Sequence, residues 1–238
     1  MTRSSIRRFV LLLAGVSLCV VACGGDSTPS LAPPLRAVRV ITEPCGDASG
    51  VDASGVLVIS NRVVTAAHVV VGSAAIRVFG GDGSEFDAAV EVLDRDRDVA
   101  VLRVEGLDAP AVRFTRFAVD DDVALVGGAA TGDAELVVTK VARIEIDTVR
   151  STSRSVRDGY ELVGESADGD SGAGLYDIDG RLGALLFAES SERSDVAFAV
   201  ASSEIDRALD APTVAHRCDP AESQLIEVGD DVRAVSDS

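Results

Sequence analysis

Three short stretches decide the fold of this chain: TAAH at residues 65–68, DVAVL at 98–102 and GDSG at 169–172. They supply one histidine, one aspartate and one serine in the order His68, Asp98, Ser171. A serine hydroxyl is a weak nucleophile at neutral pH and needs an adjacent base. A buried carboxylate on the other ring nitrogen fixes the tautomer and orientation of that base. The stretches therefore predict a hydrolytic site with Ser171 as nucleophile, His68 as general base and Asp98 as the orienting acid.

The acid of this site has two rivals in the run DRDRD at residues 94–98. Asp98 is favoured over Asp94 and Asp96 because an apolar strand follows it directly, which places its carboxylate at the entrance to a buried element. We expect the first four residues of the run to form a solvated turn. The second histidine, His216, has no partner motif and is expected to be solvated.

The order of the three residues and the residues around each of them resemble the trypsin/chymotrypsin family of serine peptidases, in particular its compact bacterial envelope members. The resemblance extends from about residue 37 to residue 209. It implies an all-β fold of two six-stranded antiparallel β-barrels, with the active site between them and a short C-terminal helix. It also implies a serine endopeptidase that works through an acyl-enzyme, with an oxyanion hole formed by the backbone N–H groups of Gly169 and Ser171.

Short runs rich in Val, Ile and Leu, separated by Gly and Asp, support a β-rich fold independently. The runs predict about twelve strands, and residues 202–209 are the one clear helix candidate. The predicted strands cover residues 37–41, 55–60, 62–65, 75–79, 86–93, 100–104, 111–114, 123–126, 135–148, 160–163, 181–187 and 196–200.

Two interpretations of the substrate pocket remain open: it selects a basic residue, or it selects a small aliphatic one. Glu165 lies six residues before Ser171, and in trypsin-like members an acid at that offset lies at the pocket base and selects Arg or Lys. Two segments resemble the pocket walls but carry side chains that shrink the pocket and favour a small aliphatic residue; their pocket residues are Phe187, Ala188, Val196 and Ala197. Ala173 stands where the family commonly has a second glycine.

The N-terminus predicts export. Residues 1–22 are a short basic segment followed by an apolar core too short to span a bilayer, which is typical of a signal peptide. The segment ends in VVAC and resembles the lipobox of bacterial lipoproteins, so Cys23 is expected to be lipidated. An incidental Cys23 after an ordinary signal is the alternative. The domains predicted are a signal peptide (1–22), a flexible tether (23–36), the peptidase domain (37–213) and an acidic tail (214–238).

Two cysteines, Cys45 and Cys218, remain after the signal and the lipid site are set aside. An even pair in an exported protein predicts a disulfide, and two free thiols are the alternative. The protein is then expected outside the cytoplasm, lipid-anchored to the cell envelope or secreted.

The charge excludes some partners. The net charge of −17 makes nucleic acid an unfavourable partner. The two distant histidines give no metal-ligand spacing, and no cofactor is expected. We expect a monomer that meets protein or peptide substrates and contacts the membrane through its lipid anchor. The alternative function is a catalytically silent relative that binds peptides or partners.

Overall fold

Antiparallel strands form two barrels in this chain. The computed structural model describes residues 36–47, 49–147, 154–214, 216, 218 and 233–235, which belong to one compact unit. The first barrel is closed in the order β1-β2-β3-β6-β5-β4. Its elements are β1 (Ala37–Pro44), β2 (Asp52–Ile59), β3 (Arg62–Ala66), α1 (Ala67–Val70), β4 (Ser73–Phe79), β5 (Glu85–Asp94) and β6 (Val99–Arg103).

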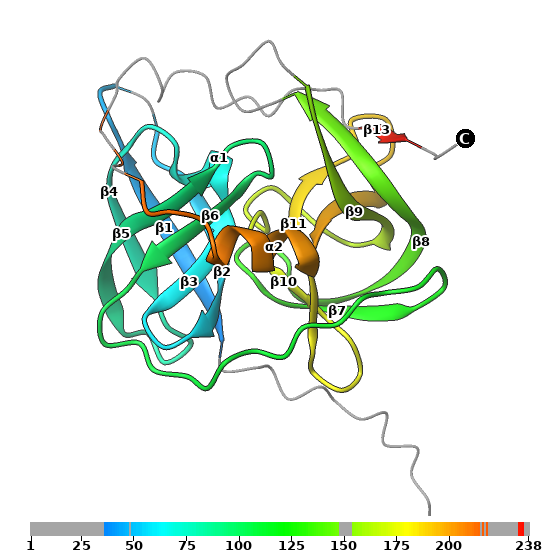
Figure 1. The fold of residues 1–238 in the computed structure, drawn as a ribbon, viewed down its shortest axis with the longest axis horizontal. Helices are drawn as coiled ribbons and strands as arrows, with labels where there is room; N and C mark the ends of the chain where they lie inside the picture. Colours follow the sequence, from blue (N-terminus) through cyan, green and yellow to red (C-terminus); the bar gives the residue numbers. More distant parts are fainter. Residues whose placement is uncertain are drawn as a thin grey trace, which may run out of the picture. The chain divides into compact units, whose positions relative to one another are not determined.

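The second barrel runs in the order β8-β7-β10-β11-β12-β9 and is closed by pairing of β8 with β9. Its strands are β7 (Asp122–Gly128), β8 (Gly132–Asp147), β9 (Arg154–Gly164), β10 (Gly174–Tyr176), β11 (Leu182–Glu189) and β12 (Val196–Ala201). α2 (Ser202–Leu209) follows, and β13 (Arg233–Val235) pairs with the outer side of β8. The predicted architecture of two six-stranded antiparallel barrels with a short C-terminal helix is therefore confirmed (Figure 1).

Two local predictions were wrong. Residues 111–114 form no strand and contribute one isolated bridge, Phe114 to Leu182. The segment instead crosses from one barrel to the other, with Val112 N donating to Val58 O and Thr115 N donating to Leu182 O. The sequence prediction also missed β10, which is only three residues long and follows the Ser171 loop directly.

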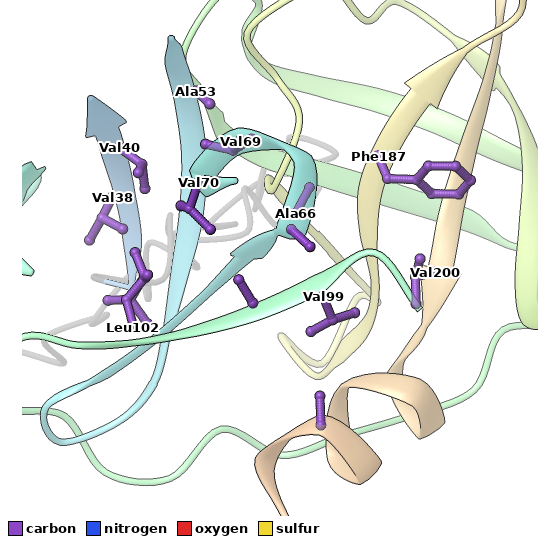
Figure 2. Packing of buried hydrophobic residues seen from close by; sticks show 14 of the residues in the cluster. Val38, Val40, Ala53, Ala66, Val69, Val70, Val99, Leu102, Phe187 and Val200 are labelled. Atoms are coloured by element: carbon purple, nitrogen blue, oxygen red, sulfur yellow. The ribbon is translucent and has the colours of Figure 1, made fainter. Parts of the chain in front are cut away.

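Strands β2, β3 and β6 of the first barrel are apolar on both faces because both of their faces are covered. Alternate side chains such as Leu57, Val63 and Leu102 pack in one core cluster, and their neighbours Val56, Val64 and Val101 pack in another. The first cluster reaches from Val38 and Leu102 of the first barrel to Phe187 and Val200 of the second (Figure 2). The second includes Tyr176 and Leu185 of the second barrel and Ile205 of α2. α2 contacts both β6 and β11 (Figure 1), so the two barrels share buried apolar surface.

The cysteine pair is joined as predicted. Cys45 and Cys218 form a disulfide across 173 residues, with their Cα atoms 5.5 Å apart. His216 beside it is partly buried rather than solvated, because its Nε2 lies 3.0 Å from Ser73 O and hydrogen-bonds to it. The disulfide ties the C-terminal segment to the end of β1.

Candidate active site

Strand pairing brings the predicted base and acid together. β3 pairs with β6 so that Ala66 lies opposite Val99, and the residues just beyond, Ala67 and Asp98, are joined by a hydrogen bond from Ala67 N to Asp98 O at 3.1 Å. His68 is the second residue of α1 and is buried. Asp98 Oδ1 accepts a hydrogen bond from His68 N at 2.8 Å, and Oδ2 lies 2.9 Å from His68 Nδ1. With Nδ1 engaged, Nε2 is the ring nitrogen left to accept a proton.

Asp98 combines a left-handed backbone conformation with a buried, ionised side chain. Its backbone lies in the left-handed region with φ of 54°, a conformation that costs energy for a non-glycine residue and is tolerated best by Asp and Asn. Its side chain is 1% exposed. Burial acts to raise the pKa of Asp98, but the charge and hydrogen bonds of His68, together with the charge of Arg157, outweigh burial and lower that pKa. Asp98 is therefore a carboxylate at neutral pH.

Ser171 lies in the loop between β9 and β10, against the first barrel. Its carbonyl oxygen accepts a hydrogen bond from Ser54 N of β2 at 2.9 Å. Its hydroxyl donates to Phe187 O of β11 at 3.4 Å, and no hydrogen bond joins it to His68 among the described residues. The next residue must be glycine, since Gly172 has φ of 91° and a Cβ there would lie 2.0 Å from Ser54 O. The structure thus brings Ser171 to the junction of the two barrels.

The loop that is predicted to form the oxyanion hole is held by Ser54, a residue that the sequence analysis did not identify. Gly169 has φ of 105°, and its carbonyl oxygen accepts a hydrogen bond from Ser54 Oγ at 3.0 Å. Ser54 Oγ in turn accepts from Ala129 N at 2.8 Å. Ser54 is fully buried and bonds to both Gly169 and Ser171. It therefore fixes the peptide between the two residues whose N–H groups are expected to bind an oxyanion.

Asp170 supports the same loop from the other side. It is fully buried, and its Oδ1 accepts hydrogen bonds from Ala130 N at 2.9 Å and Thr131 N at 3.0 Å. Its Oδ2 accepts from Ala167 N at 3.0 Å. Backbone N–H groups thus satisfy this carboxylate, and it joins the 129–131 segment to the Ser171 loop.

Ala173, the departure noted in the sequence, does not obstruct the loop. It is 1% exposed and packs in the core of the second barrel with Leu175 and Leu186. Its N–H donates to Asp170 O at 2.8 Å, which keeps the turn at the serine closed.

The residues predicted for the substrate pocket differ in their exposure to solvent. Phe187, Val196 and Ala197 are buried, Ala188 is partly buried and Glu165 is exposed. Glu189, at the end of β11, lies opposite Ala197 of β12, and its carboxylate is hydrogen-bonded to Ser166. Burial raises the pKa of Glu189, and the neighbouring acids Asp168 and Asp170 raise it further. Sequence reasoning gave no signal for Glu189, because a glutamate after an apolar run is usually a solvated strand end.

The acidic run before Asp98 is less solvated than predicted. Arg97 binds Asp94 Oδ2 at 2.5 Å and Glu204 Oε2 of α2 at 2.8 Å. Glu204 is 4% exposed and also accepts from Arg207 Nη1 at 2.7 Å. Asp94 and Arg97 therefore belong to an ion-pair network that joins the Asp98 loop to α2, whereas Asp96 is exposed.

Metal-ligand clusters and helices able to span a membrane are both absent from the described residues. In the part of the chain that the structure describes, no group of three or more His, Cys, Asp or Glu side chains could hold a metal ion. Within the same residues, no helix has the length and apolar character needed to cross a membrane.

The chain is similar to known proteins in sequence and in fold. The family model for the trypsin-like peptidase domain matches residues 53–185, and the chain belongs to that family. The active form of the Rv3671c protease from M. tuberculosis is similar, with a TM-score of 0.71 and 26% identity over 79% of this chain and 87% of that one. The inactive form of that protease matches with a TM-score of 0.62 and 24% identity over 75% and 89% of the two chains.

A further solved structure shares the fold alone. The HtrA-type protease AlgW with a tripeptide has a TM-score of 0.64 and 19% identity over 74% of this chain and 59% of that one. No curated protein matches the chain. Taken together, the chain has a trypsin-like serine protease fold, and its peptidase domain implies peptide or protein substrates.

A substitution at Ser54 tests whether its hydrogen bonds position the loop that carries Gly169 and Ser171. Replacing it in Ser54→Ala removes the hydroxyl that holds Gly169 O and leaves Ala129 N without its acceptor. Because small displacements of a catalytic group are costly, we expect the rate of labelling by a fluorophosphonate probe to fall about 10- to 100-fold. The melting temperature reports whether the fold survives. Ser60→Ala is the matched control, since Ser60 is exposed and, among the described residues, its hydroxyl bonds only to the Ala109 backbone. Equal labelling rates in Ser54→Ala and Ser60→Ala would refute the role of Ser54.

Proposed function

We propose that this chain is a serine endopeptidase that cleaves peptide bonds through His68, Asp98 and Ser171 and an acyl-enzyme. The observation that carries the proposal is the buried His68–Asp98 pair, with hydrogen bonds of 2.8 and 2.9 Å, in the same barrel whose Ser54 holds the Ser171 loop. A pair of this kind orients a base and stabilises the imidazolium that forms when the base takes a proton.

The proposed reaction begins when the Ser171 hydroxyl rotates from Phe187 O towards His68 Nε2. Ser171 Oγ attacks the substrate carbonyl as its proton passes to Nε2, and the negative charge develops on the carbonyl oxygen. The N–H groups of Gly169 and Ser171 bind that oxygen, an interaction worth about 3 kcal/mol per donor in related sites. The proton then moves from Nε2 to the leaving amine, and water activated by the same nitrogen hydrolyses the acyl-enzyme.

The competing proposal is a silent peptide-binding relative. The absent Ser171–His68 hydrogen bond does not favour it, because such bonds are often long before substrate binds. Ala173 does not favour it either, since its side chain packs in the second barrel's core. The buried, ionised Asp98 in a strained conformation costs stability, and a site that performs catalysis accounts for that cost.

A fluorophosphonate probe tests the nucleophile directly. We expect the intact protein to be labelled on Ser171, and labelling to be lost in Ser171→Ala and to fall by at least about 10³-fold in His68→Ala. Ser60→Ala is the control and should label like the parent protein. Failure of the folded parent protein to label would overturn the enzyme proposal in favour of the silent relative.

We also propose that the protein is exported and held at the cell envelope by a lipid on Cys23. Residues 1–35 lie outside the described residues, so this proposal is supported by the sequence and by the disulfide. Disulfides form and persist in oxidising compartments outside the cytoplasm, and Cys45–Cys218 is such a bond.

Metabolic labelling with a radioactive fatty acid tests the anchor on the full-length chain. The parent protein and Cys19→Ala should incorporate label and partition with membranes. Cys23→Ala should incorporate none, because the modified thiol is gone. Incorporation of label by Cys23→Ala at the parent level would show that Cys23 carries no lipid.

A further inference from the structure

One carboxylate close to the Ser171 loop has no part in the proposed mechanism. It belongs to Glu189, the last residue of β11. Its Oε1 is buried and has no hydrogen-bond partner among the described residues. A buried carboxylate oxygen that receives no hydrogen bond is costly, and a ligand that brings a donor removes the cost. Oε1 of Glu189 is therefore available to a donor group of a bound substrate.

Two segments that flank Ser171 hold this carboxylate between them. On one side, Ser171 Oγ lies 3.4 Å from Phe187 O of β11, and Glu189 follows two residues later, about 7 Å along the strand. On the other side, the side chain of Ser166 is hydrogen-bonded to the Glu189 carboxylate. Ser166 lies in the loop that leads from β9 to Ser171. The carboxylate thus joins the strand beside the nucleophile to the loop that carries the nucleophile.

The charges that act on the Glu189 carboxylate are negative. Burial raises its pKa most, the charges of Asp168 and Asp170 raise it further, and the hydrogen bond from Ser166 lowers it. A raised pKa means that the ionised form is stabilised less here than in water. A cation beside the carboxylate offsets the burial and the two neighbouring acids, whereas an apolar or acidic group adds to their cost. The position therefore favours a positively charged side chain.

The apolar residues predicted for the pocket are occupied by core packing. Phe187 and Val196 belong to the core cluster that reaches across both barrels, and Ala197 is fully buried in the core of the second barrel. Ala188 and Glu189 of β11 are only partly buried. Since the apolar side chains pack inwards, they present little surface to a substrate. This packing favours a charged contact at Glu189 over a small apolar pocket.

We propose that Glu189 determines the specificity of the proposed peptidase by binding an Arg or Lys side chain on the residue that precedes the scissile bond, the P1 residue. The long stem of Arg or Lys reaches about as far as the two strand residues from Phe187 to Glu189. Its terminal N–H groups donate to the carboxylate, Oε1 included, in a charge-assisted pair. Glu189 rather than the exposed Glu165 is thus the acid that selects the substrate. This inference rests on the proposed function.

Peptide thioesters that differ only at P1 test the role of Glu189 in the full-length protein. Arginine and citrulline are similar in shape and differ in charge, so the ratio of kcat/KM for the two substrates reports the charged contact. We expect the parent protein to prefer P1 arginine over P1 citrulline about 100-fold. Glu189→Gln keeps the size of the side chain and should lower this preference below about tenfold. Its kcat/KM for the citrulline substrate should change less than about threefold, because the Ser171 loop is left in place.

Glu192→Gln is the matched control, since Glu192 is exposed in the loop after β11 and the substitution removes the same charge. Its preference for arginine should equal that of the parent protein. A folded Glu189→Gln variant with the parent preference would overturn the role of Glu189. So would a parent protein that prefers P1 alanine or leucine to arginine, a result that needs no variant to fold. Absence of fluorophosphonate labelling in the parent protein would overturn the proposed function as well, whereas a labelled parent protein without a preference for arginine would overturn this inference alone.

Discussion

The pair of hydrogen bonds from His68 to Asp98 is the constraint on which the rest of the site depends. Both groups are buried, and both oxygens of the carboxylate are used, one by the backbone N–H and one by the ring. The pairing of β3 with β6 sets their approach, and the left-handed backbone of Asp98 turns its carboxylate back towards α1. A strained, desolvated acid of this kind persists because the barrel around it determines its position from several sides.

The second barrel brings the nucleophile to this pair through polar contacts as well as apolar packing. Ser54 of the first barrel bonds to the carbonyl oxygens of both Gly169 and Ser171. The Asp170 carboxylate accepts hydrogen bonds from three backbone N–H groups in two loops, one of which is the serine loop. Arg157 of β9 packs over the ring of Phe187, whose backbone oxygen accepts the Ser171 hydroxyl. The serine loop is thus fixed by buried hydrogen bonds, which favours a preorganised site over one assembled by substrate.

The sequence predicted the parts of this structure in which chemistry or packing restricts the choice of residue. The short apolar runs indicated a β-rich fold, the family resemblance carried by the three motifs implied the two barrels, and the cysteine pair formed the expected bond. Residues 111–114 were misjudged because an apolar segment that bridges two barrels has the composition of a strand. Arg157 gave no signal, since an arginine in the polar stretch RSVRD is ordinarily exposed. Its burial follows from the register of β9 with β8, which is a long-range property of the fold.

The central claim is that the Asp98 carboxylate makes His68 a base for Ser171, and Asp98→Asn tests it most directly. The amide keeps the size of the side chain but favours the wrong tautomer of the ring. The measurement is kcat/KM for hydrolysis of a peptide thioester by the folded variant and by the parent protein. The account predicts a fall of about 10⁴-fold with little change in melting temperature. A fall of less than about tenfold in the folded variant would contradict it, because His68 would then act without the orienting acid.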